Sequence, residues 1–232
     1  MDSVSPEKSA LAVRRILHFD PTQAAEVSAD DFVFDAAGVE SVAAECAGII
    51  LDNGDEDRAA TLISAGAACV FIGQAALLDS TVVNRLVTAH GEKCIGIYAP
   101  LKRQVVSWSF ETTSNADFKT VAPSFCEPSW EVLKADGTPT GTLAGWWLGA
   151  MCELGARQFL VRVDIRDDTD LNLCAGLVED LGDMLWMSTL NDPAPMLDDW
   201  VTYGQCRQIA LPMDIIARNT EHLSTVPHQD FT

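Results

Sequence analysis

Short apolar runs alternate along the chain with longer stretches in which apolar residues recur every three or four positions. The runs are apolar on both faces, as expected for parallel strands covered by helices, and the longer stretches are typical of helices that pack one face on a sheet. This alternation predicts repeated strand–helix units. The predicted strands are Arg15–Phe19, Phe32–Phe34, Gly48–Leu51, Cys69–Ile72, Cys94–Ile97, Phe159–Val163, Met184–Met187 and Gln208–Leu211.

Eight strands joined by helices are the number that closes a (β/α)8 barrel, so the sequence predicts an α/β fold with one barrel domain over residues 1–232. The helix signals agree with this: acidic residues occupy predicted first turns, and glycine follows predicted last turns. The predicted helices are Glu56–Ala65, one that begins at Asp79, Leu143–Leu154, and Asp192–Trp200 with Pro193 or Pro195 in its first turn.

Two regions depart from a regular barrel. The third predicted strand already begins at Gly48, so the helices of the first two units must be short or missing. After the fifth strand, residues 100–141 are too long for a simple loop. Their alternating stretches Val105–Phe110 and Ser129–Leu133 predict a β-hairpin insertion over one mouth of the barrel. Trp108 and Trp130 lie on this hairpin and predict an exposed apolar surface for a protein partner or for self-association.

Composition narrows the classes of function. The chain has 232 residues, 48% of them hydrophobic, and a net charge of −19. That charge argues against binding nucleic acid or an anionic membrane surface. No apolar run approaches the roughly 18 residues of a membrane-spanning helix, and the N-terminus lacks the pattern of a secretory signal. The cysteines are dispersed and odd in number, which predicts reduced thiols in a cytoplasmic protein. They are Cys46, Cys69, Cys94, Cys126, Cys152, Cys174 and Cys206.

Several segments, in order, resemble one known family. A helix ending in Leu154-Gly155-Ala156 leads into the strand and charged loop of residues 159–169, with Arg166, Asp167 and Thr169. Upstream, residues 62–77 read Leu-Ile-Ser-Ala-Gly-Ala-Ala-Cys-Val-Phe-Ile-Gly-Gln-Ala-Ala-Leu, and residues 91–97 supply a fifth strand at the right distance. Over roughly residues 48–216 this order is similar to the isomerase and cyclase barrels of histidine biosynthesis, HisA and HisF. The segments 130–133 and 137–142, with Trp147, look like the hairpin and helix start of the cyclase branch.

The resemblance implies two opposed aspartates as general base and general acid. Asp20, at the end of the first strand, matches the base; alternatively it is a surface residue that begins a turn before Pro21. At the fifth strand the acid is replaced by Tyr98, whose ordinary pKa of about 10 suits that role poorly at neutral pH. In the sixth unit Asp167 matches a family aspartate, and Arg162 stands where the isomerase has threonine.

The family's phosphate-binding turns are the most altered part. Such turns need glycine because bare backbone amides must approach the phosphate closely. Here the turns after the third, seventh and eighth strands contain Asp52, Asp55, Pro212 and Asp214 and almost no glycine. The family's bisphosphate is therefore not expected to bind. The remaining candidates for ligand contact are Gly73, Gln74, Lys102, Arg103, Arg162 and Ser188.

Three functions remain open. The first is a diverged barrel that has lost isomerisation of the ProFAR bisphosphate and either acts on another small molecule at its mouth or has no catalytic activity. The second is a protein-interaction subunit that uses the hairpin. The third is a still-active sugar-phosphate isomerase with an Asp acid–base pair. No cofactor is expected, and no metal either, since the histidines lack ligand spacing. The acidic loop of Asp164, Asp167, Asp168 and Asp170 is interpreted as solvated.

Overall fold

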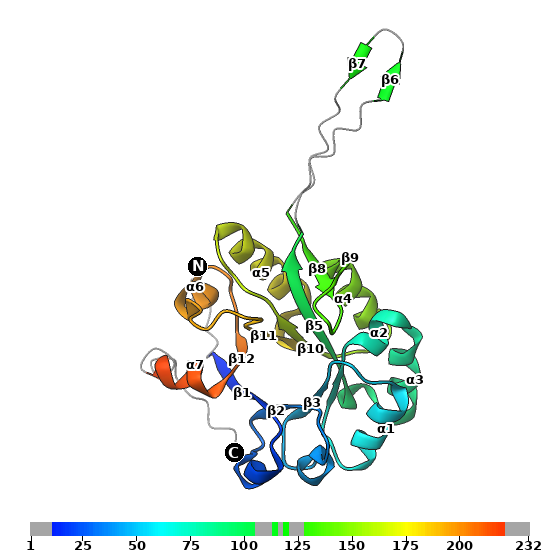
Figure 1. Cartoon of the computed structure of the whole chain (residues 1–232), viewed down its shortest axis with the longest axis vertical. Helices are drawn as coiled ribbons and strands as arrows, with labels where there is room; N and C mark the ends of the chain where they lie inside the picture. Colours follow the sequence, from blue (N-terminus) through cyan, green and yellow to red (C-terminus); the bar gives the residue numbers. More distant parts are fainter. Residues whose placement is uncertain (1–10, 105–112, 116–117, 121–127, 221–232) are drawn as a thin grey trace, which may run out of the picture.

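In the computed structural model, which describes residues 11–104, 113–115, 118–120 and 128–220, eight parallel strands close into a barrel (Figure 1). The strand order is β1-β2-β3-β4-β5-β10-β11-β12, and β12 pairs with β1. The α/β barrel prediction and all eight predicted strands are confirmed. The strands are β1 (Ala12–His18), β2 (Asp31–Phe34), β3 (Gly48–Leu51), β4 (Val70–Ile72), β5 (Ile95–Arg103), β10 (Gln158–Arg162), β11 (Leu185–Ser188) and β12 (Gln208–Leu211).

Helices lie outside the barrel: α1 (Glu56–Ser64), α2 (Gln74–Leu78), α3 (Thr81–His90), α4 (Ala144–Glu153), α5 (Asp168–Leu181), α6 (Leu197–Thr202) and α7 (Met213–Arg218). The first two strands are followed only by the 3-10 turns η1 (Pro21–Glu26) and η2 (Val39–Val42), so the shortened first units are confirmed. Two further 3-10 turns, η3 (Glu92–Cys94) and η4 (Gly182–Met184), precede β5 and β11. None of the helices in these described residues has the length and apolar character needed to cross a membrane.

The helix predicted to begin at Asp192 starts later, at Leu197. Pro193 and Pro195 precede it rather than forming its first turn. The reason is local hydrogen bonding: the Asp192 carboxylate accepts a bond from the backbone N–H of Ala194 at 2.9 Å, and such side-chain bonds favour a turn over a helix.

Two apolar layers hold the barrel. The larger one lies between the strands and the helices. The smaller one fills the barrel and includes Trp186. Phe71 occupies the centre, where Gly48 and Gly96 leave room for its ring: a β-carbon on them would lie 2.8 Å and 2.5 Å from Phe71. Arg14 covers Trp186, with its guanidinium 4.8 Å from the ring centre.

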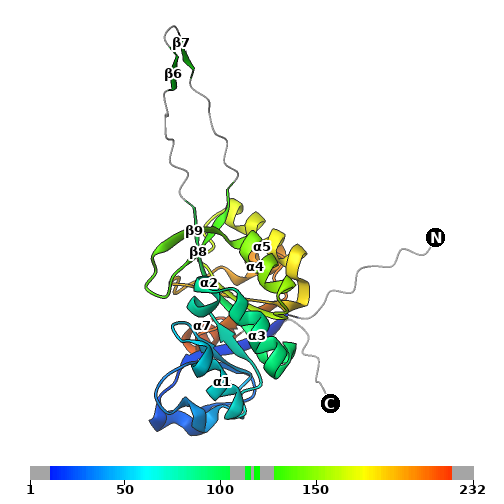
Figure 2. The ribbon, with the colours of Figure 1, turned by 90° about the vertical axis from the view of Figure 1, so that its right-hand side faces the viewer.

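Beyond the barrel, β5 continues and pairs antiparallel with β8 (Trp130–Leu133), which pairs with β9 (Pro139–Leu143). We call residues 130–143 the arm; Figure 2 shows it beside α4 and α5. The strands β6 (Thr113–Asn115) and β7 (Phe118–Thr120) pair with each other. The insertion after β5 is thus confirmed, and β8 is its second predicted strand. The first, Val105–Phe110, lies outside the described residues together with Trp108.

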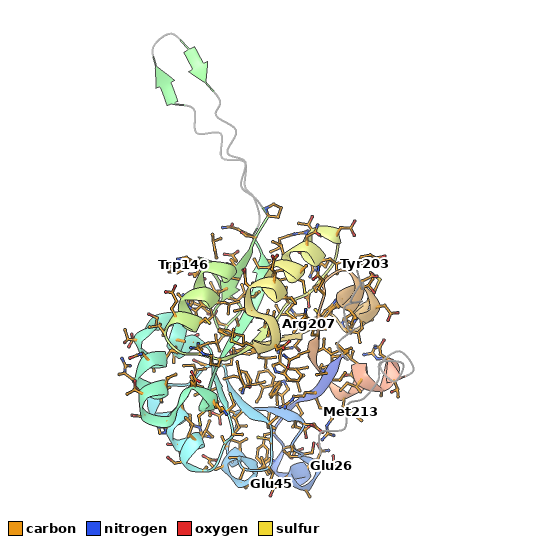
Figure 3. The ribbon with its side chains drawn as sticks, turned by 180° about the vertical axis from the view of Figure 1, so that it is seen from behind. Glu26, Glu45, Trp146, Tyr203, Arg207 and Met213 are labelled. Atoms are coloured by element: carbon orange, nitrogen blue, oxygen red, sulfur yellow. The ribbon has the colours of Figure 1, made fainter. Side chains whose placement is uncertain are left out.

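The expectation that Trp130 forms an exposed surface is wrong. Its side chain is 3% exposed, because the ring belongs to the larger apolar layer and its Nε1–H points to Asp170 Oδ1 at 3.4 Å. A different tryptophan is exposed. Trp146, near the start of α4, is 72% accessible and points away from the body of the protein (Figure 3).

Candidate functional site

A pocket of about 650 Å³ lies where the carboxyl ends of the barrel strands meet the arm. Asp52 enters it from the end of β3, Tyr98 from β5 and Arg162 from β10, while Lys134 comes from the arm and Asn191 from the loop after β11. The carboxyl end of a parallel barrel is where its ligand sites form, because the loops that follow the strands converge there. This pocket is therefore the candidate functional site.

The pocket concentrates positive charge in a strongly acidic protein. Five of the chain's 15 lysines and arginines line it, against three aspartates. The cations are Lys102, Arg103, Lys134, Arg162 and Arg166. In the described part of the chain, neither Lys102 nor Lys134 forms a salt bridge, and both side chains are exposed. A hollow lined in this way attracts anions in spite of the net charge of the whole molecule.

Arg162 is the best-positioned cation on the pocket floor. Its Nε donates to the carbonyl of Thr189 at 2.8 Å and one Nη to the carbonyl of Leu190 at 2.9 Å. The other Nη lies 3.5 Å from the hydroxyl of Tyr98, and the guanidinium covers the ring of Phe34 at 5.5 Å. Carbonyls hold the group in place without neutralising its charge, so the cation remains available to an anionic ligand.

Asp52 and Tyr98 share this floor, and burial raises the pKa of both. The positive charge of Arg162 opposes the rise in each case. They lie close together because Gly73 stands between them: a β-carbon on Gly73 would be 3.4 Å from Asp52 Cα and 3.2 Å from the Tyr98 ring. A carboxyl group with a raised pKa in a cleft is a candidate acid–base group. From the sequence alone, Asp52 is expected only to repel phosphate.

Asp52→Asn is expected to raise the free energy of unfolding at neutral pH, because the amide avoids the cost of burying a charge. Since the folded-state pKa is raised, this cost is absent below about pH 4, where both states carry a neutral acid, and grows as the pH rises through that range. Urea unfolding at about pH 3 and pH 7 measures it. Asp57→Asn, at an exposed position on α1, is the control. An equal effect of Asp52→Asn on stability at both pH values would contradict a raised pKa of Asp52 in the folded state.

Asp170 anchors the arm to the barrel. Its side chain is 2% exposed, and its two oxygens lie 3.3 Å from an Nη of Arg103 and 3.0 Å from the backbone N of Arg166. Asp167 caps α5 by accepting the N–H of Asp170 at 3.1 Å, and it also binds Arg103 at 2.6 Å, which lowers the pKa of the Asp167 carboxyl. Together with the contact to Trp130, these bonds fix β5, the arm and the loop after β10 around the pocket.

Four of the residues predicted for catalysis or ligand contact line the pocket: Tyr98, Lys102, Arg103 and Arg162. The remaining ligand candidates lie around it. Gln74 accepts a bond from the N–H of Ala135 at 3.2 Å and so ties α2 to the arm. Gly73 precedes α2, and Ser188 is fully buried at the end of β11.

The two predicted catalytic aspartates lie outside this pocket's lining. Asp167 occupies the start of α5 described above. Asp20 is exposed and caps η1, where its Oδ1 accepts from the backbone N of Thr22 at 2.9 Å and from the Thr22 hydroxyl at 2.8 Å. These two bonds lower the pKa of Asp20. Asp20 lines a separate hollow of about 280 Å³ beside Met213. The fold therefore places Asp52, rather than Asp20, beside Tyr98 and Arg162.

No protein-family model matches this chain. The barrel fold is established by the strand pairing, and the likeness to the histidine-biosynthesis barrels stays a prediction drawn from the segments quoted above.

Proposed function

We propose that this barrel binds a small anionic molecule beneath the arm and is an acid–base enzyme of the isomerase or lyase type, diverged from the isomerase and cyclase barrels of histidine biosynthesis. The observation that carries the proposal is the grouping of Asp52, Tyr98 and Arg162 on the floor of a pocket whose rim is cationic. The exposed Lys102 and Lys134 attract the ligand's anionic group.

The floor supplies the parts that proton transfer next to a carbonyl requires. Asp52 takes the proton from carbon and returns it to a neighbouring atom, since its raised pKa brings it nearer to the working pH than an ordinary carboxyl. The Tyr98 hydroxyl and the Arg162 guanidinium lie next to each other and donate hydrogen bonds to the oxyanion that develops on the carbonyl oxygen. Tyr98 acts as a neutral donor, because burial raises its pKa.

The other two functions have less support. A protein-interaction subunit built on the hairpin loses the contribution of Trp130, which is buried, and retains the exposed Trp146 and Leu143 at the start of α4. A still-active isomerase of the ProFAR bisphosphate requires Asp20 and two phosphate sites. Asp20 faces a hollow other than the cationic pocket.

The first test is a direct assay of ProFAR conversion by the wild type, Asp20→Asn and Asp52→Asn. We expect no turnover by any of the three. Turnover that disappears in Asp20→Asn and persists in Asp52→Asn would restore the isomerase assignment and contradict the role of Asp52.

The second test measures anion binding by calorimetry, with succinate, acetate and inorganic phosphate as probes. Replacing both Lys102 and Lys134 with glutamine should weaken the tightest-bound probe about tenfold, since each exposed charge contributes roughly 0.5–1 kcal/mol. Lys93→Gln is the matched control, because Lys93 is an exposed lysine in η3, before the start of β5. An affinity that the double variant leaves unchanged would place the anion elsewhere.

A further inference from the structure

The loop after β11 binds a carboxylate of the chain itself. Asp164 Oδ1 accepts hydrogen bonds from three consecutive backbone amides, those of Leu190 at 3.1 Å, Asn191 at 2.7 Å and Asp192 at 2.9 Å. Consecutive amides that converge on one point form a concave anion site. In this loop the site is filled by a side chain from the end of β10.

A fourth donor completes the site. Asp164 Oδ2 lies 3.5 Å from an Nη of Arg166, and the Asp164 side chain is only 10% exposed. Arg166, Leu190 and Asn191 line the same pocket as Arg162, and so does Asp164 itself, so the occupied anion site lies in the pocket wall. One carboxylate therefore uses three amides and a guanidinium that would otherwise be open to a ligand.

We propose that Asp164 is a built-in anion that closes a backbone anion site in the pocket wall, and that it thereby restricts the ligand to one anionic group, held at the Lys102 and Lys134 side. The part of this proposal that concerns the ligand rests on the proposed function. The part that concerns the occupied anion site rests only on the contacts of Asp164. A second anionic group on a ligand would meet amides that are already bonded and a like charge beside them. Asp164 is thus a specificity-determining residue rather than a catalytic one.

Removing the carboxylate should open the site to an external anion. The probe is inorganic phosphate, titrated against sodium chloride of equal ionic strength into the ¹⁵N-labelled full chain, with backbone amide shifts as the readout. In Asp164→Ala we expect the amide resonances of Leu190, Asn191 and Asp192 to shift saturably with phosphate. The thermal midpoint should rise by roughly 3 °C or more under near-saturating phosphate. In the wild type these three amides should not respond.

Asp164→Asn is the matched control, because its side-chain oxygen still accepts from the three amides and keeps the site filled. It should behave like the wild type. If Asp164→Ala does not fold, Asp164→Ser replaces it, since the shorter hydroxyl leaves most of the site empty. Saturable shifts in the opened variant alone support the proposal. The proposal would be overturned if the three amides of a folded Asp164→Ala or Asp164→Ser variant did not respond to phosphate, or if those of the wild type already did.

The outcome can be separated from the fate of the proposed function. If the proposed ligand pocket is wrong, replacing Lys102 and Lys134 leaves anion affinity unchanged while the phosphate response of Asp164→Ala is unaffected. If the proposal of an occupied anion site is wrong, the three amide resonances of Asp164→Ala do not respond to phosphate, and the lysine variants still weaken anion binding in the pocket.

Discussion

Asp170→Ala is expected to lower the free energy of unfolding by about 2 kcal/mol, because it removes a buried carboxylate and leaves two of its donors without an acceptor. Three groups contact this carboxylate: Arg103, which keeps its bonds to Asp167, the indole of Trp130 and the backbone N–H of Arg166. They belong to β5, the arm and the loop after β10. The arm should therefore loosen before the barrel unfolds, and anion binding in the pocket should weaken with it.

Urea denaturation gives the global effect, and hydrogen exchange of residues 130–143 gives the local one. Asp168→Ala is the control, since Asp168 lies in the same first turn of α5 with an exposed side chain. Its loss should cost a few tenths of a kcal/mol through the helix dipole. A similar loss in the two variants, or unchanged exchange in the arm, would show that Asp170 does not anchor it.

Gly96→Ala is expected to destabilise the barrel by about 2–3 kcal/mol through overpacking. The new methyl would lie 2.5 Å from Phe71 Cδ1 and 3.1 Å from Cys69 Sγ, in an interior where Phe71 is fully buried. Neither neighbour can move aside without displacing a strand. Chemical unfolding measures the loss. Phe71→Leu in the same chain should recover part of it, so the double variant should be more stable than the sum of the two single effects predicts.

Gly149→Ala provides the matched control for that substitution. Gly149 lies within α4, where an added β-carbon meets nothing within 4 Å. Alanine should stabilise there by about 0.5–1 kcal/mol through helix propensity. Strictly additive effects of Gly96→Ala and Phe71→Leu would mean that the glycine is not needed to accommodate the ring.

The candidate site was only partly accessible from the sequence. The sequence predicts Lys102 and Arg103 near a barrel mouth because they follow the fifth predicted strand, and Arg162 as a ligand residue from the family resemblance; all three line the pocket. Asp52 was overlooked as an acid–base group, although an acid directly after a buried strand is the signal that identifies such a position. Asp20 also follows a strand, so this signal cannot decide which of the two aspartates is the better acid–base candidate. The two differ in environment: burial raises the pKa of Asp52, whereas the pKa of Asp20 is lowered.

Local sequence patterns are sufficient to predict the barrel. Strand positions follow from local runs of apolar residues, and closure follows from the number of strand–helix units, so neither depends on distant contacts. The short first units followed from chain length in the same way. Which charged groups come into contact, in contrast, depends on the packing of distant segments. Asp164 lies 26 residues from Leu190 along the chain and Asp170 lies 40 from Trp130, yet each pair is hydrogen-bonded. Such pairing depends on how β10, β11 and the arm pack, and no local pattern records it.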